Sequence, residues 1–313
     1  MNVLVTGVTG FAGRHLAELL ADRGARVVGA GRRPASDAAL PEAVADYVQA
    51  DLRVPAEAAT VVAEAAPERV FHLAALASVS RSWDEPLPAM RDNYLIAANV
   101  LEAVSAGRPE TTVLVACSGE EYGPPERLPV TEDAPLRPHN PYAAGKAAAD
   151  ILAGFYADAR GLRVIRTRAF NHAGPGQSDT YVVSSLARQI AAAELAGESE
   201  VTVMTGNAAV RRDFTDVRDV VRAYADLADA GESPLCNVCS GAAVAVTDIL
   251  AALAGQTPLK VDRQTDPGLL RENEVMEIVG SNKRLVEATG WAPRYELSRT
   301  VTDTLDWWRA ELA

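Results

Sequence analysis

The chain has 313 residues, 48% of them hydrophobic, so it can bury a substantial core and intrinsic disorder is excluded. Its net charge is −12, from 30 basic against 42 acidic residues, which excludes nonspecific electrostatic binding to nucleic acid or to an anionic membrane. The N-terminus has neither the basic segment nor the long apolar core of a signal peptide, and no later apolar stretch could span a bilayer. We therefore expect a cytoplasmic protein.

Apolar strands alternate with amphipathic helices through the first half of the chain. Apolar runs bounded by turn residues predict strands, and apolar residues at helical spacing, such as Leu16, Leu19 and Leu20, predict helices. In chain order these are a strand at 2–6, a helix ending at 23–24, a strand at 26–30, a helix at 56–65, a strand at 70–73, a helix at 90–106, a strand at 112–116, a helix at 141–160 and a strand at 163–168. This repeated winding predicts an α/β fold of Rossmann type, with a doubly wound parallel sheet.

The second half of the chain is less regular. Its predicted elements are helices at 182–196, 216–229 and 246–254 and strands at 201–204 and 235–239. We expect an NAD(P)-binding Rossmann domain over residues 1–170, together with part of 213–240, and a smaller substrate-binding α/β cap made mainly of residues 171–313. Cys236 and Cys239 lie on the last of these strands and face opposite sides of the sheet, so buried thiols are expected there. The four histidines lack metal-ligand spacing, so no metal site is expected.

A glycine-rich turn, Thr6-Gly7-Val8-Thr9-Gly10-Phe11-Ala12-Gly13, joins the first strand to the first helix. Glycines in such a turn let the backbone approach a pyrophosphate, whose charge then sits at the positive end of the helix. Because the strand before it and the helix after it are both predicted, this context favours a dinucleotide-binding turn over an ordinary tight turn. The expected cofactor contacts are Gly7, Thr9, Gly10, Phe11 and Gly13.

The end of the second strand reads Gly29-Ala30-Gly31-Arg32-Arg33, where dinucleotide-binding folds recognise the adenosine ribose. An acidic residue at this place selects NAD, and an arginine accommodates the 2'-phosphate of NADP. The segment has no carboxylate, while Arg32 and Arg33 offer forked donors for a phosphate. We therefore expect NADP. NAD stays possible, since the two arginines could be solvated residues that open a loop.

Ser118, Tyr142 and Lys146 form the candidate catalytic group. Pro141 suits the first position of a helix, so Tyr142 and Lys146, four residues apart, lie on one face of it. A free tyrosine has a pKa of about 10, and we expect the Lys146 ammonium and the positive nicotinamide ring of the cofactor to lower it. Ser118, after the strand at 112–116, is expected to hydrogen-bond the phenol oxygen. This acid–base group suits hydride transfer.

With these motifs in this order, the chain resembles the extended short-chain dehydrogenase/reductases of the nucleotide-sugar branch over essentially its whole length. Within that family it looks most like the GDP-6-deoxy-4-keto-D-mannose reductases and the GDP-mannose 4,6-dehydratases, in segments 117–123, 170–177, 212–219 and 280–285. The resemblance implies cofactor contacts by Asp51, Leu52, Leu73, Ala74 and Ala75, and a catalytic role for Asn93. It also implies that the nucleotide diphosphate and ribose of the substrate are held by Asn171, Arg212, Arg271 and Glu274.

The implied activity is reduction by NADPH of the C4 keto group of a 4-keto-6-deoxy sugar linked to a nucleotide diphosphate, with GDP as the expected nucleotide. A 4,6-dehydratase, with Glu120 as the base at C5, and a nucleotide-sugar 4-epimerase use the same tyrosine and stay open as alternatives. A noncatalytic dinucleotide sensor would not need the tyrosine acid. Glu272, an extra carboxylate beside Arg271, departs from the reductase pattern and leaves the base and sugar preference open.

The predicted helices at 90–106 and 141–160 carry more apolar residues than one packing face requires, among them Leu95, Leu101, Ile151, Leu152 and Phe155. Members of the family commonly pair through these two helices. The resemblance therefore implies a homodimer built on a four-helix bundle.

Overall fold

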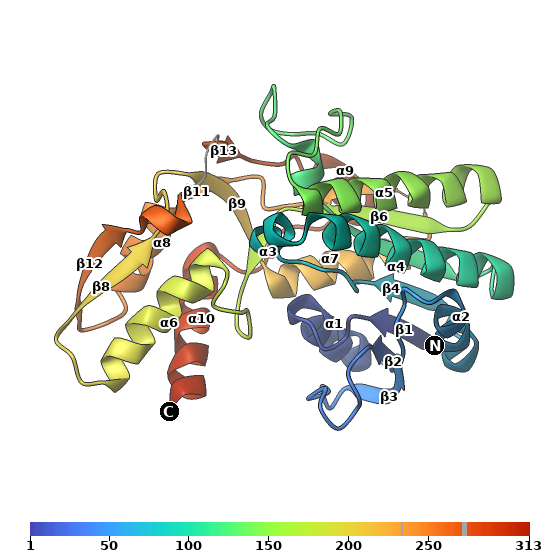
Figure 1. Ribbon diagram of the computed structural model, residues 1–313, viewed down its shortest axis with the longest axis horizontal. Coiled ribbons are helices and arrows are strands. Elements are labelled where there is room, and N and C mark those ends of the chain that lie inside the picture. The colour runs from blue at the N-terminus through green and yellow to red at the C-terminus, as the bar shows by residue number, and fades with distance from the viewer. Residues whose placement is uncertain (233, 271–273) are drawn as a thin grey trace.

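The computed structural model describes residues 1–232, 234–270 and 274–313. Figure 1 shows a larger part, at the right, where helices cover a central sheet, and a smaller part, at the left, that ends with the C-terminal helix. Within the described ranges, no helix combines the length and the apolar character that crossing a lipid bilayer requires.

The larger part is built on a seven-stranded sheet whose neighbouring strands all run parallel. Its strands are β1 (Asn2–Thr6), β2 (Arg26–Gly31), β3 (Val44–Gln49), β4 (Arg69–His72), β5 (Thr112–Ser118), β6 (Val164–Ala169) and β10 (Leu235–Val238). Their order is β10-β6-β5-β4-β1-β2-β3, so the winding reverses between β1 and β4. Ligands of doubly wound sheets bind at such a switch point, beyond the carboxyl ends of the strands.

Two helical layers bury the two faces of this sheet, because successive side chains of a strand point to opposite sides. Val3 and Val5 of β1 join the core under α1 (Phe11–Asp22) and α7 (Val217–Ala230). Leu4 joins the opposite core, under α2 (Pro55–Ala65), α4 (Pro86–Gly107) and α5 (Pro141–Arg160). The predicted Rossmann-type fold is confirmed.

The smaller part has its own core, in which α6 (Val182–Leu195), α8 (Val246–Ala254) and α10 (Leu297–Leu312) pack together. Strands β8 (Glu200–Thr205) and β12 (Lys260–Thr265) pair in parallel beside them. A small sheet of β7 (Asn171–Ala173), β9 (Arg211–Asp216), β11 (Ala243–Ala245) and β13 (Glu277–Ile278) links the two parts. The short elements α3 (Val79–Asp84), η1 (Gly119–Tyr122), η2 (Pro267–Leu269) and α9 (Lys283–Thr289) complete the described chain.

The sequence did not predict β3 or β9 as strands, and both omissions have a physical cause. β3 is an edge strand that exposes Ala45, Asp46 and Gln49, so it lacks the apolar run of a buried strand. β9 reads Arg-Arg-Asp-Phe-Thr-Asp, and its buried Asp213 carboxylate accepts from the Ser240 and Gly280 N–H groups, which are tertiary contacts that local composition does not reveal. The part of 213–240 expected to accompany the Rossmann domain supplies α7 and β10, although the division into two functional domains remains a prediction.

Candidate active site

A cavity of about 570 Å³ opens beyond the carboxyl ends of β1, β2, β4, β5 and β6. It is lined by every described residue expected to contact the cofactor, namely Gly7, Thr9, Gly10, Phe11, Gly13, Arg32, Arg33, Asp51, Leu52, Leu73, Ala74, Ala75, Tyr142 and Lys146. Ser118, Glu120 and Asn171 also line it, whereas Asn93, Arg212 and Glu274 do not. Arg271 and Glu272 lie outside the described residues.

The glycine turn brings the start of α1 to this cavity. Gly7 has a φ of +73°, a conformation that favours glycine, and its carbonyl accepts from the Gly10 N–H at 2.9 Å. A Cβ on Gly13 would lie 2.2 Å from the Gly7 carbonyl oxygen, so only glycine allows the turn and the helix to pack this closely. The helix therefore directs its first backbone N–H groups towards the place where a pyrophosphate would lie.

Arg32 and Arg33 lie at the far end of the cavity, and both are exposed. The nearby Asp51 carboxylate accepts hydrogen bonds from Arg53 Nε at 2.9 and 3.0 Å. These hydrogen bonds lower the pKa of Asp51 to about 2. Arg53 also reaches Asp92 at 3.0 Å, so Asp51 belongs to an ion-pair network at this end of the cavity. The Asp51 carboxylate at this end of the cavity therefore already has a cationic partner, Arg53.

The Asn93 side chain is hydrogen-bonded to the backbone of the loop after β4, on the side away from the cavity. Its Oδ1 accepts from the Leu76 N–H at 2.7 Å, and its Nδ2 donates to the Leu76 carbonyl at 3.3 Å. The side chain is 3% exposed and does not face the cavity. Asn93 therefore holds the backbone that carries Leu73, Ala74 and Ala75, while a direct catalytic role remains a prediction.

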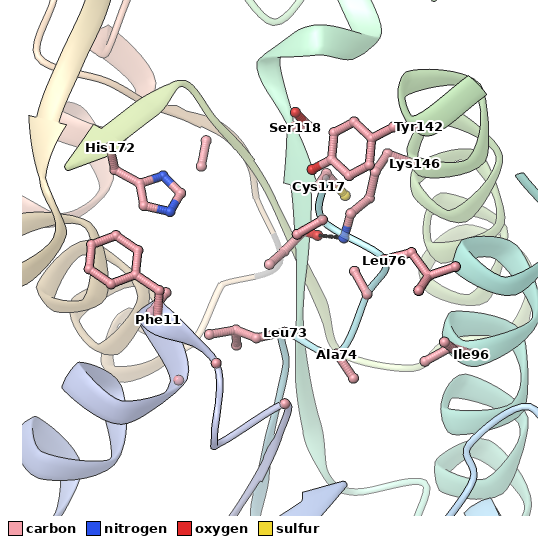
Figure 2. A pocket seen from close by; sticks show the side chains of 18 of the residues that line it. Phe11, Leu73, Ala74, Leu76, Ile96, Cys117, Ser118, Tyr142, Lys146 and His172 are labelled. Carbon is pink, nitrogen blue, oxygen red and sulfur yellow. Dashed lines mark hydrogen bonds between the residues drawn. The ribbon is translucent and has the colours of Figure 1, made fainter. Parts of the chain in front are cut away.

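Ser118, Tyr142 and Lys146 converge on one wall of the cavity (Figure 2). Asn140 begins α5 by accepting from the Ala143 N–H at 2.8 Å, which fixes the first turn that carries Tyr142. Lys146 is buried, and its Nζ donates to the Ala116 carbonyl of β5 at 2.7 Å. Ser118, the last residue of β5, lies beside the Tyr142 phenol, and its side chain acts to lower the pKa of that group. The structure thus brings together the three side chains that the sequence placed on separate elements.

The electrostatics of this wall differ from the expectation that Lys146 lowers the pKa of Tyr142. Burial raises the pKa of the Tyr142 phenol above its usual value, and the Ser118 side chain opposes this only in part. Burial also lowers the pKa of Lys146. Desolvation of the phenol is the largest effect on this pKa, and the Lys146 Nζ is directed to the Ala116 carbonyl, to which it donates at 2.7 Å. The second contributor named, the nicotinamide ring, is positive only in the oxidised cofactor, so the predicted lowering applies to that state and not to the reduced one.

Glu120 borders the cavity beside the catalytic group. Its Oε2 accepts from Asn140 Nδ2 at 3.1 Å, so the residue that caps α5 also holds this carboxylate. Glu120 is half-buried, and it is one of the groups that raise the pKa of Tyr142. This position is compatible with a base or with a polar contact to the sugar.

The expected substrate-binding residues are more dispersed. Asn171 is exposed at the start of β7 and lines the cavity. Arg212 lies on β9, where its Nη1 donates to the Arg211 carbonyl at 2.9 Å. Glu274 is half-buried and does not border the cavity described here. Only Asn171 of the described residues in this set is therefore brought to the catalytic group.

Several cavity residues were not identified from the sequence as site residues. Tyr181 lines the cavity, lies close enough to raise the pKa of Tyr142, and donates to the Ala77 carbonyl at 3.4 Å. His172 stacks on Phe11 with ring centroids 5.8 Å apart, and joins the glycine turn to β7. The sequence signal that could have indicated these residues is the turn-rich segment 171–178 before an amphipathic helix, because a loop between domains often covers a binding site.

A family model for GDP-mannose 4,6 dehydratase matches residues 4–304. The chain belongs to this family. It is 33% identical to the GDP-6-deoxy-D-mannose reductase of Pseudomonas aeruginosa over 314 residues, 99% of this chain and 98% of the relative. It is 31% identical to the UDP-glucose 4-epimerase of Mycolicibacterium smegmatis, over 99% of both chains.

Solved structures agree with this assignment. The structure of RMD from Pseudomonas aeruginosa complexed with NADPH matches with a TM-score of 0.86 and 31% identity, over 99% of this chain and all of that one. The resemblance stated from sequence motifs is confirmed, and so is the class of enzyme, a nucleotide-sugar-modifying member of the short-chain dehydrogenase/reductases.

Proposed function

We propose that this protein uses NADPH to reduce the C4 keto group of a 4-keto-6-deoxy sugar linked to a nucleotide diphosphate, with GDP as the nucleotide. The observation that carries the proposal is one continuous cavity with Arg32 and Arg33 at one end and the Ser118–Tyr142–Lys146 group at the other. The GDP-6-deoxy-D-mannose reductase among its relatives supports the choice of substrate.

The residues present fit a bound dinucleotide. The turn at Gly7 and Gly13 leaves no room for a Cβ, so backbone can lie against a pyrophosphate, and the two arginines offer forked donors to a ribose phosphate. When bound, NADPH supplies the hydride that reduces the carbonyl carbon. Asn171, which lines the cavity, is a proposed substrate contact, and we retain Arg212, Arg271 and Glu274 as proposed contacts to its nucleotide.

Tyr142 is the proposed proton donor. Its phenol gives a proton to the oxygen of the keto group as negative charge develops there, and a raised pKa keeps that proton in place until then. In this proposal the Ser118 hydroxyl hydrogen-bonds the phenol and orients it, in keeping with its effect on the pKa of Tyr142. Lys146, fixed by the Ala116 carbonyl, offers a positive charge to the phenolate that remains.

The test is incubation of the protein with NADPH and GDP-4-keto-6-deoxy-D-mannose, following cofactor absorbance and product mass. We expect NADPH to be consumed as the product gains a hydride and a proton. Tyr142→Phe should abolish turnover while keeping cofactor affinity, whereas Tyr94→Phe, the same change on the exposed face of α4, should leave turnover intact. Unchanged turnover in Tyr142→Phe would refute the assignment of the acid.

Two other reactions are favoured by particular observations. Glu120 lies beside Tyr142, where a 4,6-dehydratase would need a base, and a UDP-glucose 4-epimerase is 31% identical. GDP-mannose supplied with NADP and no reductant would give a 4-keto product only if the protein is a dehydratase. Conversion of UDP-glucose to its C4 epimer would identify an epimerase.

A second copy of the chain is the partner we propose for the outer face of α4 and α5. These helices lie side by side, and large apolar residues stay exposed on them, with Leu87 at 77%, Ile151 at 64% and Phe155 at 48%. Leu101, by contrast, is buried in the core. Two such pairs of helices would form a four-helix bundle and cover this apolar surface.

A further inference from the structure

Two fully buried carboxylates, on Glu121 and Asp150, lie next to the catalytic group but outside the cavity lining. Glu121 belongs to η1, directly after Ser118, and Asp150 lies on α5, one turn beyond Lys146. Buried acids are rare unless a partner neutralises them, so the hydrogen bonds of each oxygen decide what this pair does.

Asp150 has a full set of cationic partners. Arg168 of β6 donates to its Oδ2 from Nε at 2.7 Å and contacts the same oxygen with Nη2 at 2.6 Å. Arg166 donates to its Oδ1 at 3.2 Å. The remaining Arg168 nitrogen, Nη1, donates to the Tyr122 hydroxyl at 3.0 Å and the Glu132 carbonyl at 3.2 Å. The Arg168 guanidinium is thus committed to other groups.

Glu121 is satisfied on one side only. Its Oε1 accepts from the Ser118 N–H at 2.8 Å. Its Oε2 is buried and accepts no hydrogen bond from the described residues, and Arg168 Nε lies 3.7 Å away, beyond hydrogen-bonding distance. An ionised carboxylate would leave that oxygen without a donor, whereas a proton on it would make it a donor to Asp150, which is within reach.

The charges around Glu121 also favour its protonated, neutral form. Burial and the negative charge of Asp150 raise the pKa of Glu121 well above its usual range, and the Ser118 hydrogen bond and Arg168 oppose this only in part. The titratable and charged groups that face Glu121 are Cys117 on β5, Tyr122 on η1, Tyr142, Lys146 and Asp150 on α5, and Arg168 on β6. A negative charge on Glu121 would make Tyr142 a weaker proton donor.

We propose that Glu121 is a positioning residue that works as a neutral carboxylic acid, donating to Asp150 and accepting from the Ser118 N–H. In this form it ties β5 to α5 and holds the Ser118 hydroxyl against Tyr142 without adding charge beside the proton donor. The inference deepens the proposed reductase function and rests on it for its kinetic test.

Three variants separate this role from simple packing. Glu121→Ala removes both hydrogen bonds and should lower kcat on the order of 10–100-fold, because Ser118 loses its anchor. Glu121→Gln keeps the shape, the neutral charge, an acceptor and a donor, so it should rescue most of that loss. Glu126→Gln, an exposed carboxylate in the loop after η1, is the matched control and should behave as the wild type.

The pH profile of kcat tests the charge directly. If Glu121 is neutral, the alkaline limb of Glu121→Gln superimposes on that of the wild type. A limb shifted to lower pH would show that Glu121 is ionised in the wild type, and a Gln variant as slow as the Ala variant would show that a neutral donor and acceptor do not restore the role. Either result would overturn the proposal.

Infrared spectroscopy gives a readout that needs no turnover. The protein at pH 7 should show a neutral carboxylic acid band that Glu121→Gln lacks and Glu126→Gln keeps. Absence of that band from the wild type would overturn the role of Glu121 whatever the substrate. A band present in a protein that reduces no nucleotide 4-keto sugar would instead support a neutral Glu121 and refute the proposed function.

Discussion

Replacing Arg32 and Arg33 with alanine tests how the protein selects its cofactor. Both side chains are exposed, so a contact with the 2'-phosphate of NADP is weaker than a buried charge-assisted hydrogen bond. We take about 1–2 kcal/mol for each arginine, below the range for buried bonds to charged groups. Each single change should then raise the Kd for NADPH about 5- to 30-fold, and the double change should raise it from about 30-fold to several hundred-fold.

NADH gives an internal control for this measurement, because it lacks the 2'-phosphate. Titration calorimetry should show a Kd for NADH that changes little in any of these variants, and the loss of NADPH affinity should shrink as salt is added. Arg26→Ala, at the opposite end of β2 and paired with Asp46, removes the same charge away from the cavity and should bind NADPH as the wild type does. Equal loss of NADPH and NADH affinity would refute the reasoning, since it would mean that the arginines support the loop and not the phosphate.

Three further changes test the turn, the buried acid and the apolar face. Gly13→Ala places a Cβ 2.2 Å from the Gly7 carbonyl oxygen, so NADPH affinity should fall at least about tenfold, with a loss of about 1–3 kcal/mol in unfolding free energy by urea denaturation; unchanged binding would mean that the turn relaxes. Because the pKa of Glu121 is raised, the folded protein keeps a proton that the unfolded chain loses above about pH 4.3, so the contribution of Glu121 to stability falls as the pH rises above that value. Glu121→Gln lacks this fall, so its unfolding free energy relative to the wild type should be higher at pH 7 than at pH 4; the reverse order would show an ionised Glu121. Ile151→Glu should convert a dimer to a monomer in light scattering, while Val286→Glu, on exposed α9, should not; a monomeric wild type at micromolar concentration would contradict the four-helix bundle.

The sequence predicted those parts of the fold whose signal is local. Buried strands such as β1 and β5 are continuous apolar runs, and α5 begins at a proline and ends before a glycine, so its bounds at residues 141–160 were predicted as observed. α10 was missed, because its apolar stripe is interrupted by Thr300 and Thr304, whose buried hydroxyls bond within the protein. Whether a threonine is buried depends on tertiary packing and cannot be derived from spacing alone.

The residues of the site likewise divide into those with a local sequence signal and those that depend on tertiary packing. The glycine turn and the Tyr142–Lys146 pair are constrained by chemistry at fixed spacing, so they could be identified without the fold. Tyr181 carries no such motif, and it reaches the cavity only because the loop after β7 folds over Tyr142. The raised pKa of Tyr142 could not be predicted either, because it depends on how far the folded chain buries the phenol.

The catalytic group alone does not select among reduction, dehydration and epimerisation, since Ser118, Tyr142 and Lys146 serve hydride transfer in either direction. The two ends of the cavity differ in a way that supports the proposed reduction. An enzyme that consumes NADPH must exchange its cofactor at every turnover, whereas an epimerase restores its own. Arg32 and Arg33 are exposed, while Lys146 and Ser118 are buried, so the ribose end is open to solvent and the reacting end is shielded from it. An open recognition end with phosphate-binding donors suits a reductant that enters and leaves, and a shielded reacting end protects the hydride from water.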